Sequence, residues 1–112
     1  MDPHIISHEV INKVPLVYIE GDMTSEADDA VMSLYNKLKT EFSPARLVFN
    51  FTKTSYINSA GIATLINIIQ DMNDNGGKVS FVGLSNHFLK VMDIVGISDF
   101  VDIYETNQDA LK

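Results

Sequence analysis

The sequence predicts one α/β domain, with a mixed, mostly parallel sheet of four to five strands and about four helices. Three observations predict this class. Strand-like apolar segments alternate with segments of helical periodicity, which is typical of parallel strands joined by crossover helices. One segment, RLVFNF at 46–51, is almost wholly apolar, as in a strand covered on both faces. The chain has 112 residues and a hydrophobic content of 46%, enough for one core. We therefore expect residues 1–112 to form a single domain.

The chain is expected to begin with a β-hairpin. Residues 5–12 are rich in β-branched side chains, and LVYIE at 16–20 follows Val14-Pro15 as a second strand. A turn is expected at Gly21, because glycine adopts the backbone angles that many turns require. These features place two paired strands before the first helix.

A helix of about 16 to 18 residues is expected next, by its apolar spacing. Thr24 and Ser25 are candidate caps, and Asp28 stands three residues after the second of them. Ser43-Pro44 ends the helix, and the apolar strand at 46–51 follows. The apolar residues on one face of this helix are Ala27, Val31, Leu34 and Leu38.

A second helix is expected to begin near Ser59, after a short polar connection at 52–55. Its apolar residues recur at helical spacing, and Asn75-Gly76-Gly77 ends it with residues that are common at helix ends. The residues at this spacing are Ile62, Leu65, Ile66, Ile69 and Met72.

The last third of the chain predicts a strand, a helix, an edge strand and a helical turn. KVSFVGL at 78–84 is the strand, and either Ser85 or Asn86 caps the short, very apolar helix that follows it. FVDIYE at 100–105 is expected at a sheet edge, and NQDALK at 107–112 forms the last turn.

The charge of the chain argues against nucleic acid as a partner. The formal net charge is −7, with 8 basic residues among 15 acidic ones. Because phosphate binding needs a surplus of lysine and arginine on one face, we expect neither nucleic acid nor an anionic membrane to be bound directly.

The sequence also indicates a cytoplasmic protein. It contains no cysteine, which agrees with a reducing compartment. No apolar run approaches the ~20 residues that a membrane span needs. Met1–Val14 carries His4, His8 and Glu9 where a signal peptide would have an unbroken apolar region. We therefore expect neither secretion nor membrane insertion.

No arrangement of catalytic or metal-binding residues stands out, so we expect no enzyme, no metal and no cofactor. His4, His8 and His87 show no Ser-His-Asp or metal-ligand pattern. The segment from Asp71 resembles the start of a calcium loop, but Val82 occupies the position that must supply a carboxylate.

Ser59 is the residue whose position indicates a function. Either it or Asn58 would cap the second helix, a structural role contributing about 1 kcal/mol. The junction also follows a buried strand of an α/β sheet at its carboxyl end, where loops commonly carry function. Capping and a functional role are compatible.

The segment YINSAGIATLINII, followed by residues 73–106, resembles the STAS domain and, within it, the stand-alone anti-sigma factor antagonists. Their hallmark is Asp-Ser-(Ser/Thr/Ala)-Gly-(Leu/Ile)-Gly at the start of the second helix. Here the hallmark segment spans residues 58–63 and reads NSAGIA. The similarity covers nearly the whole chain and implies the element order derived above.

This resemblance implies a binding module that a phosphate switches off. In the family, a serine-kinase anti-sigma factor with a histidine-kinase-like ATPase fold phosphorylates the serine equivalent to Ser59. A metal-dependent serine phosphatase restores it, and the unphosphorylated form binds the kinase and frees the sigma factor. The alternative is a STAS subunit of a larger signalling assembly with a partner outside any sigma-factor pathway.

The chain departs from the family pattern at three positions. Asn58 replaces the usual aspartate, Ala63 replaces the second glycine, and Thr24 stands where many members carry an aspartate. Two negative charges are thereby absent from the expected contact surface, so recognition by a kinase is expected to differ. We expect the partner to bind Thr24, Asn58, Ser59, Ala60, Gly61 and Ile62, because both helix starts should lie at one end of the sheet.

Overall fold

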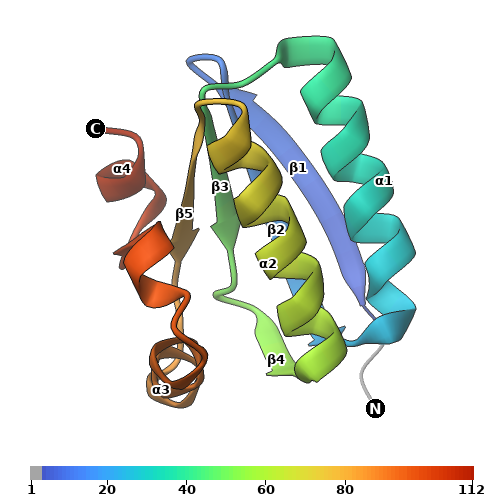
Figure 1. The fold of residues 1–112 in the computed structure, drawn as a ribbon, viewed down its shortest axis with the longest axis vertical. Coiled ribbons are helices and arrows are strands. Elements are labelled where there is room, and N and C mark those ends of the chain that lie inside the picture. Colours follow the sequence, from blue (N-terminus) through green and yellow to red (C-terminus); the bar gives the residue numbers. More distant parts are fainter. Residues whose placement is uncertain (1–3) are drawn as a thin grey trace.

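Six strands and four α-helices make up the part of the chain that the computed structural model describes, residues 4–112 (Figure 1). Met1–Pro3, which the predicted domain includes, lie outside the described residues. The strands are β1 (Ile5–Ile11), β2 (Val14–Met23), β3 (Arg46–Asn50), β4 (Thr54–Ile57), β5 (Lys78–Val82) and β6 (Val101–Tyr104). The helices are α1 (Ser25–Phe42), α2 (Ser59–Asp74), α3 (Asn86–Val95) and α4 (Asn107–Ala110), with a 3-10 turn η1 (Ser98–Phe100) after α3.

The strands form one mixed sheet in the order β1-β2-β3-β5-β6. β1 pairs with β2 in antiparallel fashion through a tight turn, and the remaining pairs are parallel. β3 lies between β2 and β5, and its residues Leu47–Phe49 are buried. The prediction of an α/β class with this strand at the centre is confirmed.

β4 is a sixth strand, which the expected count of four to five omits. It pairs with the last residues of β2 in parallel, and Ile57 lies opposite Met23. The sequence predicts a polar connection at 52–55 instead of a strand. The reason for the difference is that β4 has only four residues and none of them is buried. The apolar pattern that marks a strand arises from burial, so this strand leaves no such pattern.

Gly21 lies inside β2, so the turn expected there is wrong. The pairing of β2 with β3 ends at Tyr18, and its pairing with β4 starts at Gly21, where the register shifts. The φ angle of Gly21 is 82°, a left-handed conformation that glycine adopts without strain. The irregularity lets β2 bend from one parallel neighbour to another, as bulges do, instead of ending.

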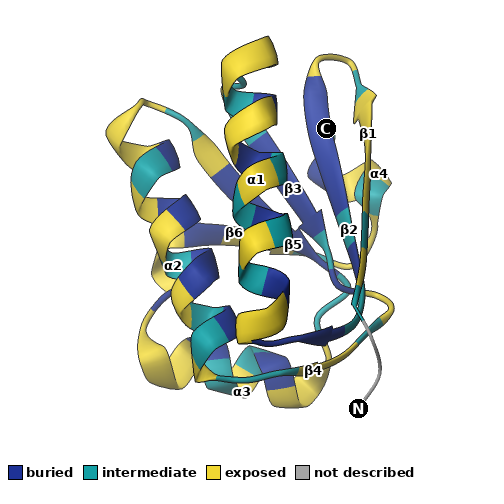
Figure 2. Cartoon of the chain, turned by 90° about the vertical axis from the view of Figure 1, so that its right-hand side faces the viewer, coloured by how far each residue is buried: buried dark blue, intermediate teal, exposed yellow. Residues whose placement is uncertain are grey.

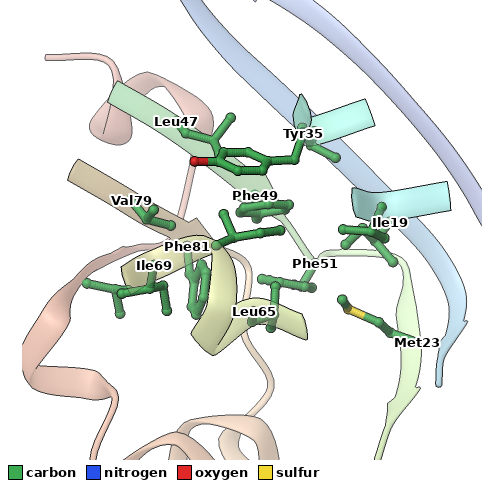
Figure 3. Packing of buried hydrophobic residues seen from close by; sticks show 14 of the residues in the cluster. Ile19, Met23, Tyr35, Leu47, Phe49, Phe51, Leu65, Ile69, Val79 and Phe81 are labelled. Atoms are coloured by element: carbon green, nitrogen blue, oxygen red, sulfur yellow. The ribbon is translucent and has the colours of Figure 1, made fainter. Parts of the chain in front are cut away.

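The main core lies between the sheet and helices α1 and α2, which cover one of its faces (Figure 2). Phe49, Phe51 and Phe81 extend from the sheet toward Leu65 and Ile69 of α2 (Figure 3). The Phe51 and Phe81 rings meet edge to face, with centroids 5.1 Å apart, a favourable aromatic arrangement. The α2 face predicted from its periodicity is therefore the face that fixes the helix on the sheet.

Helix α4 covers part of the opposite face of the sheet. A smaller core there contains Leu16, Val48, Val82 and Ala110, drawn from β2, β3, β5 and α4. The last helical turn, which the sequence predicts, is therefore also packed against the sheet. The central strands are covered on both faces, which explains why RLVFNF contains so few polar residues.

Asp71 links α2 to α1 and makes stability depend on pH. Lys39 Nζ donates to Asp71 Oδ2 at 2.8 Å, and the Tyr35 hydroxyl donates to the same oxygen. The Lys39 hydrogen bond, followed by that of Tyr35, holds the pKa of the Asp71 carboxyl below its usual range. The contact therefore stabilises the fold above the ordinary carboxyl pKa of about 4, and this contribution is lost as the pH falls through the lower, folded-state value.

We expect Asp71→Asn to lower the free energy of unfolding at about pH 7 by about 0.2–1 kcal/mol, because the aspartate side chain is 39% exposed and screened by water. The deficit should shrink below about pH 4, because the Asp71 carboxyl of the unfolded parent is protonated there and that of the folded parent becomes protonated at still lower pH. Urea unfolding at both pH values measures it. The control is Asp74→Asn, an exposed carboxylate of the same helix. An Asp71→Asn deficit that stays constant down to about pH 2 would contradict the assignment.

Candidate partner-binding site

The starts of α1 and α2 lie side by side at the end of the sheet where β2 and β3 finish (Figure 1). The backbone connects them directly, because Asn58 N donates to Met23 O at 3.3 Å. Met23 precedes the α1 cap, and Asn58 precedes the first residue of α2. The expectation that these two junctions meet at one sheet end agrees with this geometry.

Asn58, and not Ser59, caps α2. The Asn58 side chain accepts from Gly61 N at 3.0 Å, and its backbone oxygen accepts from Ile62 N at 3.0 Å. Asn58 has extended backbone angles, φ −110° and ψ −176°, which a capping residue requires. Ser59 is the first residue inside the helix, so its hydroxyl is not needed for capping.

The cap assignment predicts unequal effects of two neighbouring substitutions. Asn58→Ala should lower the free energy of unfolding by about 1 kcal/mol, because the amide of Gly61 loses its acceptor. Ser59→Ala, the matched control, should change it by less than about 0.5 kcal/mol, because Ser59 is exposed. Thermal or urea unfolding measures both variants. A larger loss from Ser59→Ala than from Asn58→Ala would show that the serine is the cap.

Gly61 lies where α2 passes directly over the end of β2. A Cβ atom at this position would lie 2.9 Å from Ile57 Cγ1 and closer still to the carbonyl oxygen of Met23. No side chain fits in that space without moving backbone. The glycine of the motif therefore sets the distance between the start of α2 and the α1 junction.

The six predicted contact residues lie together but offer unequal surfaces. Ser59 is exposed, and its hydroxyl makes no hydrogen bond within the described part of the chain. Asn58, Ala60 and Ile62 are half-buried around it. Thr24 is only 8% exposed, and its hydroxyl accepts from Glu26 N at 3.3 Å as the cap of α1.

Gly61 and Thr24 are buried, so they position the two helix starts and contribute little to the surface that a partner can contact. The accessible part of the site consists of Ser59 with its half-buried neighbours. Glu26 and Asp28 stand in the first turn of the adjacent helix, so the surroundings are acidic. A second negative group at Ser59 would add to an existing negative field.

Two features of the site were not predicted from the sequence. The buried Thr64 hydroxyl of α2 donates to Asp28 of α1, which ties the two helix starts together, and its oxygen also lies 3.1 Å from Ala60 O of its own helix. Tyr56 of β4 is 54% exposed and borders a hollow of about 60 Å³ shared with His87 and Phe88 of α3. An aromatic residue in an otherwise polar segment is the one sequence signal that could have indicated the second feature.

The described residues hold no group of three or more histidine and carboxylate side chains arranged to bind a metal ion. None of the helices in residues 4–112 is both long and apolar enough to span a membrane. The chemistry available at the site is that of one free hydroxyl at the start of a helix, bordered by carboxylates.

The sheet order, with β4 beside the end of β2 and the starts of α1 and α2 at one end of the sheet, defines a small α/β domain. Residues 6–110 match the family model described as the STAS domain. Since the match spans nearly the entire chain, the protein belongs to the STAS domain family.

Solved structures share this fold at low sequence identity. An anti-sigma factor antagonist from Mycobacterium paratuberculosis matches with a TM-score of 0.85 and 19% identity, covering 98% of this chain and 92% of that chain. The Bacillus cell fate determinant SpoIIAA in its phosphorylated form matches with a TM-score of 0.78 and 15% identity, covering 96% of each chain. A sulfate transporter family protein from Wolinella succinogenes matches with a TM-score of 0.79 and 16% identity, covering 92% of this chain and 85% of that chain.

Proposed function

We propose that this protein is an anti-sigma factor antagonist, a binding module and not an enzyme, whose switch is phosphorylation of Ser59. Without phosphate, it binds a serine-kinase anti-sigma factor of the histidine-kinase-like ATPase fold, and the sigma factor is released. A metal-dependent serine phosphatase reverses the phosphorylation. The protein acts in the cytoplasm and contacts neither nucleic acid nor membrane directly.

The observation that carries this proposal is the exposure of a serine that the fold does not need. Asn58 caps α2, so Ser59 is free to change chemically without loss of the helix. Family membership and the antagonists among the structural neighbours support the same assignment. A kinase could reach the hydroxyl without unfolding any element.

The position of Ser59 explains how phosphate would change binding while sparing the fold. The amides at a helix start point toward added negative charge, and the helix dipole favours it, so the phosphorylated domain stays folded. Phosphate adds about −1.5 to −2 charges to a surface flanked by Glu26 and Asp28. Docking would then require the removal of water from that charge, which weakens the complex.

The second candidate is a STAS subunit of a larger assembly whose partner lies outside any sigma-factor pathway. The Wolinella neighbour favours it, because its description places the same fold in a sulfate transporter family. The departures at Asn58 and Thr24 also favour it, since both replace the aspartates common among the antagonists.

Identification of the partner separates the two candidates. The full chain, carried as bait in its own host, should co-purify an ATPase of the serine-kinase class, and incubation with that partner and ATP should place phosphate on Ser59. Mass spectrometry of both products measures this. A transporter or scaffold subunit as the partner, or phosphate on Ser55 or Thr54 instead, would favour the second candidate.

A further inference from the structure

An apolar groove lies between α2 and the segment that follows α3, away from the start of α2. Its volume is about 350 Å³. Ile69 and Ile97, which are buried, form its floor, and Ile66 of α2 is half-buried beside them. Val95 and Phe100 form its wall and are 46% and 55% exposed.

The end of α3 explains why these apolar side chains remain exposed. Gly96 ends the helix in a left-handed conformation, φ 80°, and Ile97 N donates to Met92 O at 3.1 Å. This reversal turns Ile97 into the core. Val95 and Phe100 stay outside, and so does Ile94, which is 82% exposed. Monomeric proteins rarely leave large apolar side chains clustered on the surface without a partner to cover them.

Asp74 lines the groove. The exposed carboxylates of Asp93 and Asp99, which we name together with Asp74 the acidic rim, stand two residues before Val95 and directly before Phe100 in the sequence. Neither lysine nor arginine is found among the lining residues that the structure describes. Lys90, the basic residue of α3, precedes Ile94 by one turn and does not line the groove.

We infer that this groove is a second docking surface, which takes a basic amphipathic helix of a partner protein. The apolar face of such a helix would cover Val95 and Phe100, and its lysines or arginines would meet the acidic rim, as in other helix-in-groove complexes. A second copy of this chain fits poorly, because each copy carries a net charge of −7. A fatty acid fits poorly as well, because its carboxylate would face Asp74.

This surface is separate from the proposed phosphorylation site. Ser59 begins α2, and the lining residue of α2 that stands nearest to it in the sequence, Ile66, lies roughly 10 Å further along the helix axis. A partner helix in the groove would therefore leave Ser59 accessible. The protein could hold one partner at the groove while the start of α2 binds or releases another.

The test uses the full chain and a synthetic helical peptide of leucine and lysine, about 14 residues long, with leucines at helical spacing. NMR titration should show shifts confined to the groove, around Ile69, Val95 and Phe100. Phe100→Ser should weaken binding about tenfold, because it removes a central aromatic anchor. Val95→Ser, a second exposed position, guards against a local folding defect of the first variant.

Two charge reversals provide the matched control. Asp74→Lys and Glu41→Lys change the net charge equally, but Asp74 lines the groove, whereas Glu41, near the end of α1, does not. Asp74→Lys should weaken binding severalfold more than Glu41→Lys. The same peptide with glutamate in place of lysine should bind at least tenfold more weakly than the basic one.

Several results would overturn the inference. One is a set of NMR shifts spread over the whole acidic surface, and another is an equal loss of peptide affinity from the two charge reversals. A third is that laurate produces the same groove shifts as the peptide. The last is that sedimentation shows a dimer of this chain, which Phe100→Ser converts to a monomer. Ser59→Asp should leave peptide binding unchanged. Because this readout does not involve the kinase, the inference and the proposed function can fail independently.

Discussion

Ser59→Asp is expected to weaken the complex with the co-purified kinase by about 1–3 kcal/mol, roughly 5- to 150-fold in Kd, while the domain stays folded. Aspartate at a helix start is favoured by the dipole, so the unfolding midpoint should change little. The loss of binding arises because the charge enters a surface already bordered by Glu26 and Asp28 and must be desolvated on docking. Isothermal titration calorimetry and urea unfolding measure the two quantities.

Two further variants show whether the effect belongs to this position. Ser59→Ala should bind as tightly as the parent and accept no phosphate, so its binding becomes permanent. Ser33→Asp places the same charge on an exposed position of α1 and should leave binding unchanged. If Ser59→Asp binds as tightly as the parent, or if Ser33→Asp weakens binding to the same extent, the switch does not reside at Ser59.

Gly61→Ala is expected to lower the free energy of unfolding by about 2–3 kcal/mol, although alanine is the better helix former. The added methyl would meet Ile57 and the backbone of Met23, and the backbone cannot yield as a side chain does. The start of α2 must then move away from the α1 junction. Partner binding should fall with stability, because the exposed residues around Ser59 lose their placement.

The comparison is Gly76→Ala, whose Cβ would meet nothing within 4 Å but whose φ of 79° disfavours alanine. Its cost should be about 1 kcal/mol, with partner binding unchanged. NMR spectra should show shifted amide signals for Met23 and Thr24 in the Gly61 variant alone. A Gly61→Ala protein as stable as the parent would mean that the close approach is not essential.

The sequence by itself determined the features that depend on local pattern. Helical periodicity and capping residues placed the helix starts near Thr24, Ser59 and Asn86, as the structure has them. The apolar run at 46–51 identified the central strand, because a strand covered on both faces excludes polar residues. Ser59 was also singled out from its neighbours in the chain, whereas its exposure is a finding of the structure.

Only the tertiary structure decided between Asn58 and Ser59 as the cap. Both side chains can accept a hydrogen bond, so the choice depends on which residue keeps extended backbone angles. Those angles follow from the pairing of β4 with the end of β2, and β4 buries none of its residues, so no apolar pattern marks it. The need for glycine at position 61 likewise comes from Met23, a residue distant in sequence that the fold brings against α2. Contacts between distant segments leave no periodic signal in either one, and for that reason this part of the site required the folded chain.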